Sequence, residues 1–227
     1  MRSFVLALAT LLALQALAAD PAPKAHTIFL IRHGAYSPDP AADAKLGPGL
    51  NTLGIAQAKL VAARLAALPG SFSAILASPL TRAQETARVI HESLPAVHFE
   101  LADDLAECTP PTRRKEATKD DSPESLAACT AQLDRFFKQH FVPASGMEQR
   151  EIYVAHGNVI RSLIVRALGV NHDAWLEMSI GHASITQIVV EPDGRYRVIS
   201  IGDVGHIPPN MQTGATGMSE KMLAVPK

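Results

Sequence analysis

Two arginines, two histidines and one carboxylate follow apolar runs at widely separated places in this sequence, and together they suit one chemistry. The residues, with two glycines beside them, are Arg32, His33 and Gly34; Arg82; Glu107; and His156 and Gly157. A phosphoryl group in transfer spreads negative charge over three oxygens, and a planar guanidinium fork matches two of those oxygens at once. A neutral imidazole accepts a phosphoryl group, and a covalent intermediate divides one difficult step into two easier ones. The set therefore points to phosphoryl transfer.

Each side chain has a role in this hypothesis. We expect His33 to be the nucleophile, with its other ring nitrogen held by a nearby backbone carbonyl, for which that of Gly34 is a candidate. Arg32 and Arg82 would bind phosphate, and His156 would donate from a charged ring. The acid that protonates the leaving oxygen is expected to be Glu107, provided that burial raises its pKa. Helix N-termini that begin after Gly34 and Gly157 would add backbone donors. The neighbouring carboxylates of Asp103, Asp104 and Glu116 are alternatives for the acid.

Strands and helices alternate along the chain in a way that can bring these loops together. Apolar runs bounded by turn residues predict strands, and apolar residues at helical spacing predict helices. The expected elements are strands at 26–31, 74–77, 97–101 and 151–155, helices at 52–68, 81–93, 122–140 and 159–168, and a hairpin of 184–191 with 196–201. Strand, loop and helix in alternation are typical of a parallel sheet covered on both faces. Ligands bind beyond the carboxyl ends of such strands, where the polar motifs lie.

The sequence divides into four parts in this interpretation. Residues 1–19 have a positive start at Arg2, an apolar run at 4–13 and a small-x-small site, so we expect a signal peptide and an exported protein, periplasmic or secreted. The run is shorter than the roughly 20 residues that span a bilayer, so no stable membrane insertion is expected after its removal. A linker at 20–25, a single domain at 26–207 that carries the phosphoryl-transfer residues, and a loose C-terminal tail at 208–227 follow.

Composition excludes some classes of partner and leaves the cysteines open. The formal net charge is −1 and becomes −2 when Arg2 leaves with the signal, so no nucleic acid partner is expected. The 47% hydrophobic content is enough to bury one core. Cys108 and Cys129 form an even pair, which a disulfide or two free thiols would explain equally well.

Four motifs resemble, in order and spacing, those of the histidine phosphatase (phosphoglycerate mutase-like) superfamily. They are Leu30-Ile31-Arg32-His33-Gly34, Leu50-Asn51-Thr52-Leu53-Gly54-Ile55-Ala56-Gln57-Ala58, Ser78-Pro79-Leu80-Thr81-Arg82-Ala83-Gln84-Glu85-Thr86-Ala87 and His156-Gly157-Asn158-Val159-Ile160-Arg161. The resemblance implies a three-layer α/β/α sandwich with a mostly parallel central sheet and a C-terminal antiparallel hairpin. It also implies a phosphohistidine on His33, phosphate binding by Arg32, Arg82 and His156, proton donation by Glu107, and no metal or other cofactor.

The second half is similar to one branch of that superfamily, the mitochondrial serine/threonine phosphatases called phosphoglycerate mutase family member five. The similarity lies in 104–107, 156–168, 175–176, 184–186 and 202–205, followed by Pro208-Pro209. The Trp-Asp motif through which those relatives assemble is absent from 20–30, so oligomeric state stays open. The loop after Gly34 reads Ala35-Tyr36-Ser37-Pro38-Asp39 and lacks the Glu-Ser-x-x-Asn pattern of the mutases, which favours hydrolysis over mutase activity.

Two other functions compete with hydrolysis of a phosphorylated small molecule or protein. The nine histidines invite a metal-dependent hydrolase, yet no spacing typical of a zinc site is present, and we do not expect His172, His182 or His206 to be ligands. The second is an exported anion-binding module that has lost turnover, which is disfavoured because every expected catalytic position holds a competent side chain. The loops 35–49 and 106–122 face the substrate in this interpretation, but they carry no pattern that identifies it.

Overall fold

The computed structural model describes residues 21–215, which form a six-stranded sheet, a small two-stranded sheet and helices on both faces. The strands are β1 (Pro23–Lys24), β2 (His26–Arg32), β3 (Ala74–Ala77), β4 (His98–Leu101), β5 (Ala144–Ser145), β6 (Gln149–Ala155), β7 (Ile185–Val190) and β8 (Tyr196–Asp203). The helices are α1 (Thr52–Ala66), α2 (Thr81–Ser93), α3 (Pro123–His140) and α4 (Gly157–Ala167), with short 3-10 turns η1 (Asp103–Leu105), η2 (Lys115–Thr118), η3 (His172–Glu177) and η4 (Pro209–Met211).

The large sheet has the order β4-β3-β6-β2-β7-β8, and its first four strands run parallel. Strands β7 and β8 run antiparallel to their neighbours and form the expected hairpin. In the register of the sheet, Arg32 lies opposite Ala155 and Ala77 opposite Val154. The carboxyl ends of β2, β3 and β6 therefore meet at one edge, and the polar residues that follow them start from neighbouring points.

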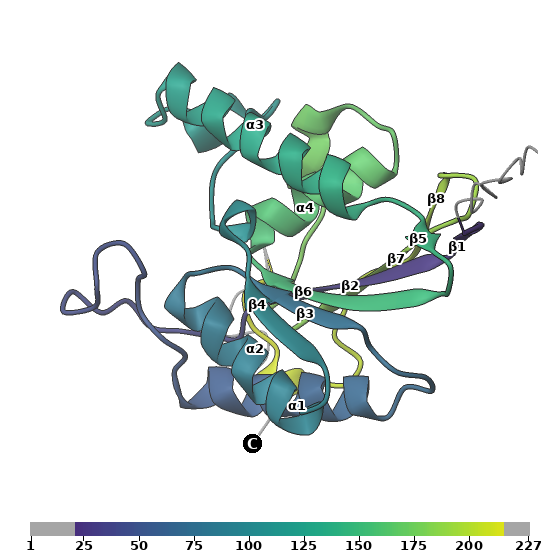
Figure 1. Cartoon of the computed structure of the whole chain (residues 1–227). Helices are drawn as coiled ribbons and strands as arrows, with labels where there is room; N and C mark the ends of the chain where they lie inside the picture. The colour runs from purple at the N-terminus through teal and green to yellow at the C-terminus, as the bar shows by residue number, and fades with distance from the viewer. Residues whose placement is uncertain (1–20, 216–227) are drawn as a thin grey trace, which may run out of the picture.

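Two hydrophobic cores lie on opposite faces of the sheet. Helices α1 and α2 cover one face, and α3 and α4 cover the other (Figure 1). Strand β2 supplies both cores by alternation: Ile28 and Leu30 point toward the α3/α4 core, whereas Phe29 and Ile31 point toward the α1/α2 core. A strand that is buried on both faces reads as a continuous apolar run, which is why β2 is recognisable in the sequence.

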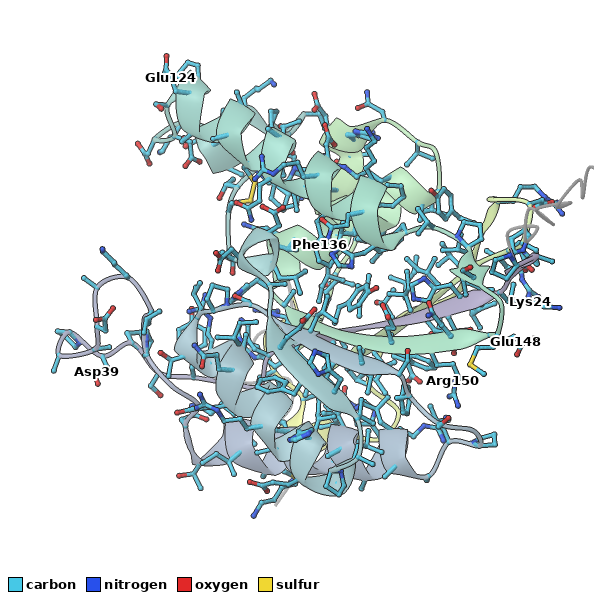
Figure 2. The ribbon with its side chains drawn as sticks, in the orientation of Figure 1. Lys24, Asp39, Glu124, Phe136, Glu148 and Arg150 are labelled. Carbon is cyan, nitrogen blue, oxygen red and sulfur yellow. A yellow bond between two sulfur atoms is a disulfide. The ribbon has the colours of Figure 1, made fainter. Side chains whose placement is uncertain are left out.

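On the α3/α4 face, Phe136 points from α3 toward the sheet (Figure 2) and its ring lies 5.3 Å from that of Tyr153, between ring centroids. Helix α3 begins as predicted, because the Ser122 hydroxyl accepts a hydrogen bond from the backbone N–H of Ser125 and Pro123 occupies the first turn. Helix α3 is also joined covalently to the loop that carries Glu107. Cys108 and Cys129 form a disulfide with their Cα atoms 5.5 Å apart, which resolves the alternative that the sequence left open (Figure 2).

The expected fold class is confirmed: the chain forms a three-layer α/β/α sandwich with a mostly parallel sheet and a C-terminal hairpin. Three expected segments differ. The helix N-terminus expected after Gly34 is not there, because the chain runs as a loop until α1 begins at Thr52. Part of the linker forms β1, which pairs with β5, and residues 208–215 pack against the domain instead of hanging loose, because side chains of α1 and β2 bind their backbone. The expected signal peptide at 1–19 and the remainder of the expected tail, 216–227, lie outside the described residues. Among residues 21–215, every helix is too short or too polar to cross a bilayer.

Candidate active site

The predicted site residues converge at the carboxyl edge of the parallel strands. Arg32 ends β2 and His33 follows it, Arg82 lies in the first turn of α2 after β3, and His156 follows β6. Glu107 comes from the loop after η1. Backbone hydrogen bonds hold the strand ends in register, since the N–H of His33 donates to Ala155 and that of Ser78 donates to Val154. The ring centroids of His33 and His156 are 5.1 Å apart.

The ring of His33 has a different partner at each nitrogen. Its Nδ1 lies 2.8 Å from the carbonyl oxygen of Gly34, which can only accept, so Nδ1 carries the hydrogen. Its Nε2 therefore has a free lone pair, and the Nε–H of Arg82 donates to it over 3.2 Å. Burial, together with the nearby His156 and Arg32, holds the pKa of His33 well below its usual value of 6.5. The ring is thus a buried neutral imidazole at neutral pH, oriented by the backbone carbonyl that the sequence suggested.

Two glycines allow the chain to pass closely behind His33. A Cβ atom on Gly34 would lie 2.5 Å from the backbone oxygen of Gly54, and a Cβ atom on Gly54 would lie 1.9 Å from that of Ala35. Any larger residue would push the His33 loop away from the start of α1. The motif Arg-His-Gly and the second motif, with its Gly54, are therefore coupled in space.

The two arginines are held differently. Arg82 donates to His33, lies 3.5 Å from the Glu107 carboxylate through Nη2, and places its Cζ 4.9 Å from the ring centre of Tyr36. Arg32 donates through Nη1 to the backbone oxygens of Ile180 and Gly214, at 2.6 and 2.7 Å. Burial lowers the pKa of Arg32 to about 10, and the positive charges of Arg161 and Arg82 add to this effect. Arg32 therefore keeps its charge at neutral pH.

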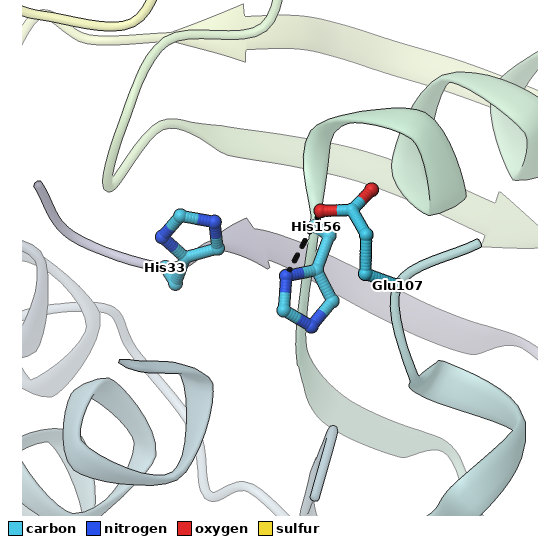
Figure 3. Close-up of side chains that lie close together, drawn as sticks. All are labelled: His33, Glu107 and His156. Carbon is cyan, nitrogen blue, oxygen red and sulfur yellow. Dashed lines mark ion pairs between the residues drawn. The ribbon is translucent and has the colours of Figure 1, made fainter. Parts of the chain in front are cut away.

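His156 and Glu107 form a contact pair beside His33 (Figure 3). The Glu107 Oε2 lies 3.2 Å from Nδ1 of His156, while Nε2 of the same ring lies 2.7 Å from the Ser78 hydroxyl. His156 is fully buried, and the Glu107 side chain is 31% exposed, so the carboxylate can exchange protons with solvent. Gly157 begins α4, and a Cβ atom there would lie 3.5 Å from Nε of Arg32, so the helix N-terminus faces the arginine.

The pKa values of this pair differ from what the sequence suggested. Burial raises the pKa of Glu107, but the contact with His156 and the charges of Arg82 and Arg32 outweigh burial, and the net shift is downward. The pKa of His156 is lowered too, mainly by burial, against the raising effect of Glu107. In the site without a bound anion, the raised pKa that the acid role of Glu107 requires is therefore not met, and the ring of His156 is not favoured as a charged donor. A phosphate dianion would raise both pKa values, because it cancels the charge of the arginines.

Two aromatic rings that lie beside His33 were not predicted from the sequence to belong to the site. The Tyr36 ring lies 5.5 Å from that of His33, and the His182 ring lies 5.4 Å from it on a different segment. Burial first, and then the charges of Arg32 and Arg82, lower the pKa of His182 to about 3. The topology could have indicated His182 in advance. Strand β7 runs antiparallel to β2, so the beginning of β7, next to His182, lies at the edge where β2 ends.

Three of the expected catalytic residues lie close enough together to bind a metal ion. Ligand atoms of His33, Glu107 and His156 all lie within 4.8 Å of one another. The charges of Arg32 and Arg82 oppose a cation at this position, since Arg82 donates directly to His33 and contacts Glu107. The arrangement favours an anion.

Comparisons with known proteins point to a family of phosphatases that use a histidine. A family profile described as "Histidine phosphatase superfamily (branch 1)" matches residues 28–112 and 110–203. The mitochondrial serine/threonine-protein phosphatase Pgam5 of Caenorhabditis briggsae is 36% identical over 195 residues, covering 83% of this chain and 67% of the relative. The human mitochondrial PGAM5 is 34% identical over 191 residues, covering 82% of this chain and 65% of its own length. The chain thus spans about two thirds of these relatives.

Solved structures share the fold. The alpha-ribazole phosphatase from Shigella flexneri superposes with a TM-score of 0.60 at 21% identity, over 78% of this chain and 96% of that one. A phosphoglycerate mutase from Plasmodium falciparum gives 0.57 at 23% identity, over 82% and 95%. The relatives also correct one expectation. They are mitochondrial proteins by name, which contradicts the prediction of an exported, periplasmic or secreted protein.

Proposed function

The chain belongs to the histidine phosphatase superfamily, and we propose that it hydrolyses phosphate monoesters through a phosphohistidine on His33. The observation that carries this proposal is the unequal treatment of the two His33 nitrogens. Gly34 holds the hydrogen on Nδ1, and the lone pair of Nε2 faces Arg82. A buried imidazole with a low pKa and a fixed tautomer is a nucleophile that needs no separate base.

In the first step, the lone pair of Nε2 attacks phosphorus and the bond from phosphorus to the leaving oxygen breaks. Arg82 shifts its N–H donors from Nε2 to the phosphoryl oxygens, and Arg32, His156 and the backbone at Gly157 supply further donors. The bound dianion raises the pKa of Glu107, so the carboxyl group is protonated when substrate is present and gives its proton to the leaving oxygen.

In the second step, water replaces the leaving group. The Glu107 carboxylate takes a proton from that water, the new oxygen bond forms at phosphorus, and the bond from phosphorus to Nε2 breaks with its electron pair returning to the ring. The loop 35–39 lacks the residues that would retain a sugar phosphate between the two steps, which supports hydrolysis. No metal takes part in this scheme, because the arginines supply the positive charge.

The substrate is a phosphorylated molecule. The serine/threonine phosphatase names of the relatives favour phosphorylated serine or threonine in a protein, and a small phosphate monoester is the alternative.

The test is intact-mass analysis after rapid quenching of the enzyme with excess substrate. We expect an acid-labile phosphoryl group on the wild-type chain and none on His33→Ala. The control His98→Ala changes a histidine on β4 that is 66% exposed and should carry the group as the wild type does. Acid-labile phosphate on His33→Ala would show that the nucleophile is another residue, and substrate binding without any phosphoenzyme or turnover would favour an anion-binding module.

A further inference from the structure

Residues 211–214 lie against the catalytic residues although they come from the far end of the domain. The buried Gln57 side chain in α1 donates to the backbone oxygen of Met211 over 2.6 Å and to Oγ1 of Thr213 over 3.0 Å. The oxygen of the same Gln57 side chain accepts from the N–H of Ala35, two residues after His33. One buried amide therefore holds both the 211–214 segment and the nucleophile loop.

The same segment reaches Arg32 directly. The carbonyl oxygen of Gly214 accepts from Nη1 of Arg32 at 2.7 Å, beside the carbonyl of Ile180 at 2.6 Å. Two carbonyls on one terminal nitrogen fix the rotation of the planar guanidinium group. Nε of Arg32 is buried and makes no hydrogen bond within residues 21–215. A buried donor of this kind calls for an acceptor, and a phosphoryl oxygen is one.

A close approach explains why residue 214 is a glycine. Its φ is +75°, and a Cβ atom would lie 2.5 Å from Nδ1 of His182 and 2.9 Å from Nη1 of Arg32. Nδ1 of His182 also lies 2.9 Å from Oγ1 of Thr213, and the backbone N–H of His182 donates to the oxygen of Thr213 at 2.9 Å. The His182 ring in turn packs 5.4 Å from His33. The segment thus touches Arg32 directly and His33 through one ring.

We propose that residues 211–214 are a positioning element of the active site, which fixes the guanidinium group of Arg32 for phosphate binding. The inference rests on the proposed function. The segment binds Nη1 of Arg32, and within the described residues 21–215 the buried Nε has no hydrogen-bond partner, so the segment orients the arginine and does not take the place of the phosphate. Burial also lowers the pKa of Arg32 to about 10, and the two carbonyls compensate part of the hydration that this charge has lost.

The test compares Gly214→Ala with Gly194→Ala in the full-length chain. Both glycines have positive φ, +75° and +83°, so both variants carry similar backbone strain. A Cβ atom on Gly194, in the turn between β7 and β8, has nothing within 4 Å, whereas one on Gly214 collides with Arg32 and His182. The readouts are the inhibition constant of inorganic phosphate, KM and kcat for an aryl phosphate, and the melting temperature.

We expect Gly214→Ala to raise the inhibition constant of phosphate and the KM roughly ten- to a hundred-fold, the worth of about one hydrogen bond to a charged group. Gly194→Ala should leave the inhibition constant and the KM unchanged, although its backbone strain should lower the melting temperature about as much as that of Gly214→Ala does. In the Arg32→Lys background, Gly214→Ala should weaken phosphate binding much less, since the guanidinium group that the segment positions is gone. Thr213→Val, which removes the hydroxyl but not the close approach, should weaken phosphate binding about two- to ten-fold, and it serves as the test if Gly214→Ala does not fold.

Equal phosphate binding by Gly214→Ala and Gly194→Ala would overturn the inference, as would unchanged binding by Thr213→Val. Tighter binding or faster turnover in Gly214→Ala would also overturn it, because the segment would then be an obstruction. These failures are distinct from failure of the proposed function, which is decided by the phosphoenzyme on His33.

Discussion

Replacement of Glu107 by Gln separates proton donation from mere support of the site. The amide keeps the shape of the side chain. Its oxygen can stay near Nδ1 of His156, which lies 3.2 Å from the carboxylate oxygen of Glu107 in the wild-type chain. It loses the proton and the negative charge. If Glu107 is the general acid, the first chemical step slows for substrates whose leaving oxygen needs a proton, and general acid catalysis contributes about 10²- to 10⁴-fold.

The charge of Glu107 also sets an expectation for binding. Its carboxylate lies 3.5 Å from Nη2 of Arg82, a separation at which two unit charges attract by about 1 kcal/mol in water and about 5 kcal/mol at an effective dielectric constant near 20. The 31% exposure of the Glu107 side chain favours the lower figure. Removal of the carboxylate frees Arg82 for phosphate, so inorganic phosphate should bind up to about five-fold tighter.

The assay compares an alkyl phosphate with p-nitrophenyl phosphate, whose leaving group departs without a proton. For Glu107→Gln we expect phosphorylation of the enzyme by the alkyl ester to slow about 10²- to 10⁴-fold and that by the aryl ester by less than about ten-fold. The aryl ester should then give a burst of nitrophenolate followed by slow turnover, because the same carboxylate activates water. The control is Glu116→Gln, which changes an exposed carboxylate in η2 that pairs with Lys119. Equal slowing with both esters, or the same pattern in Glu116→Gln, would refute the assignment.

Three further predictions concern the protonation of the site, the disulfide that joins its loop to α3, and the absence of a metal from the reaction. Burial lowers the pKa of His33 below its usual 6.5, and it lowers those of His140, His156, His182 and His206 as well, so the unfolded chain binds more protons below that pH. The free energy of unfolding should therefore fall from about pH 7 to about pH 5, and phosphate should reduce the part of the fall that comes from the site. A melting temperature independent of pH in this window would contradict the buried neutral ring. The double variant Cys108→Ser and Cys129→Ser should lose about 3 kcal/mol in urea unfolding, since the bridge closes a 21-residue separation, and an unchanged midpoint would show that the bridge does not stabilise the fold. Excess EDTA should leave kcat unchanged, whereas activity lost to EDTA and restored by zinc would indicate a metal-dependent hydrolase.

The alternation of strands and helices predicted the architecture, and the resemblance of four motifs predicted the superfamily; both are confirmed. Strand β2 is buried on both faces, so its apolar run is continuous and unambiguous. The parallel alternation of strands and helices then placed four loops at one edge without any knowledge of distances. The roles assigned to His33, Arg32, Arg82, His156 and Glu107 remain predictions, now with a geometry that makes each of them testable.

Electrostatics could not be predicted in the same way. The sequence suggested that burial would raise the pKa of Glu107, but the direction of a shift depends on distances to other charges. Only the folded chain places Oε2 of Glu107 3.2 Å from His156 and 3.5 Å from Arg82, and these contacts outweigh burial. The same holds for His182, which was not expected to be a metal ligand and which the fold places beside His33.

The sequence by itself determined which side chains stand at the ends of the parallel strands, because burial and backbone periodicity are written in local composition. The tertiary structure alone decided what completes the site from a distance: the Cys108–Cys129 bridge, the rings of Tyr36 and His182, and the 211–214 segment on Arg32. The physical reason is that hydrogen bonds and charge interactions act over a few ångströms in space, and neighbours at that range can be nearly two hundred residues apart along the chain.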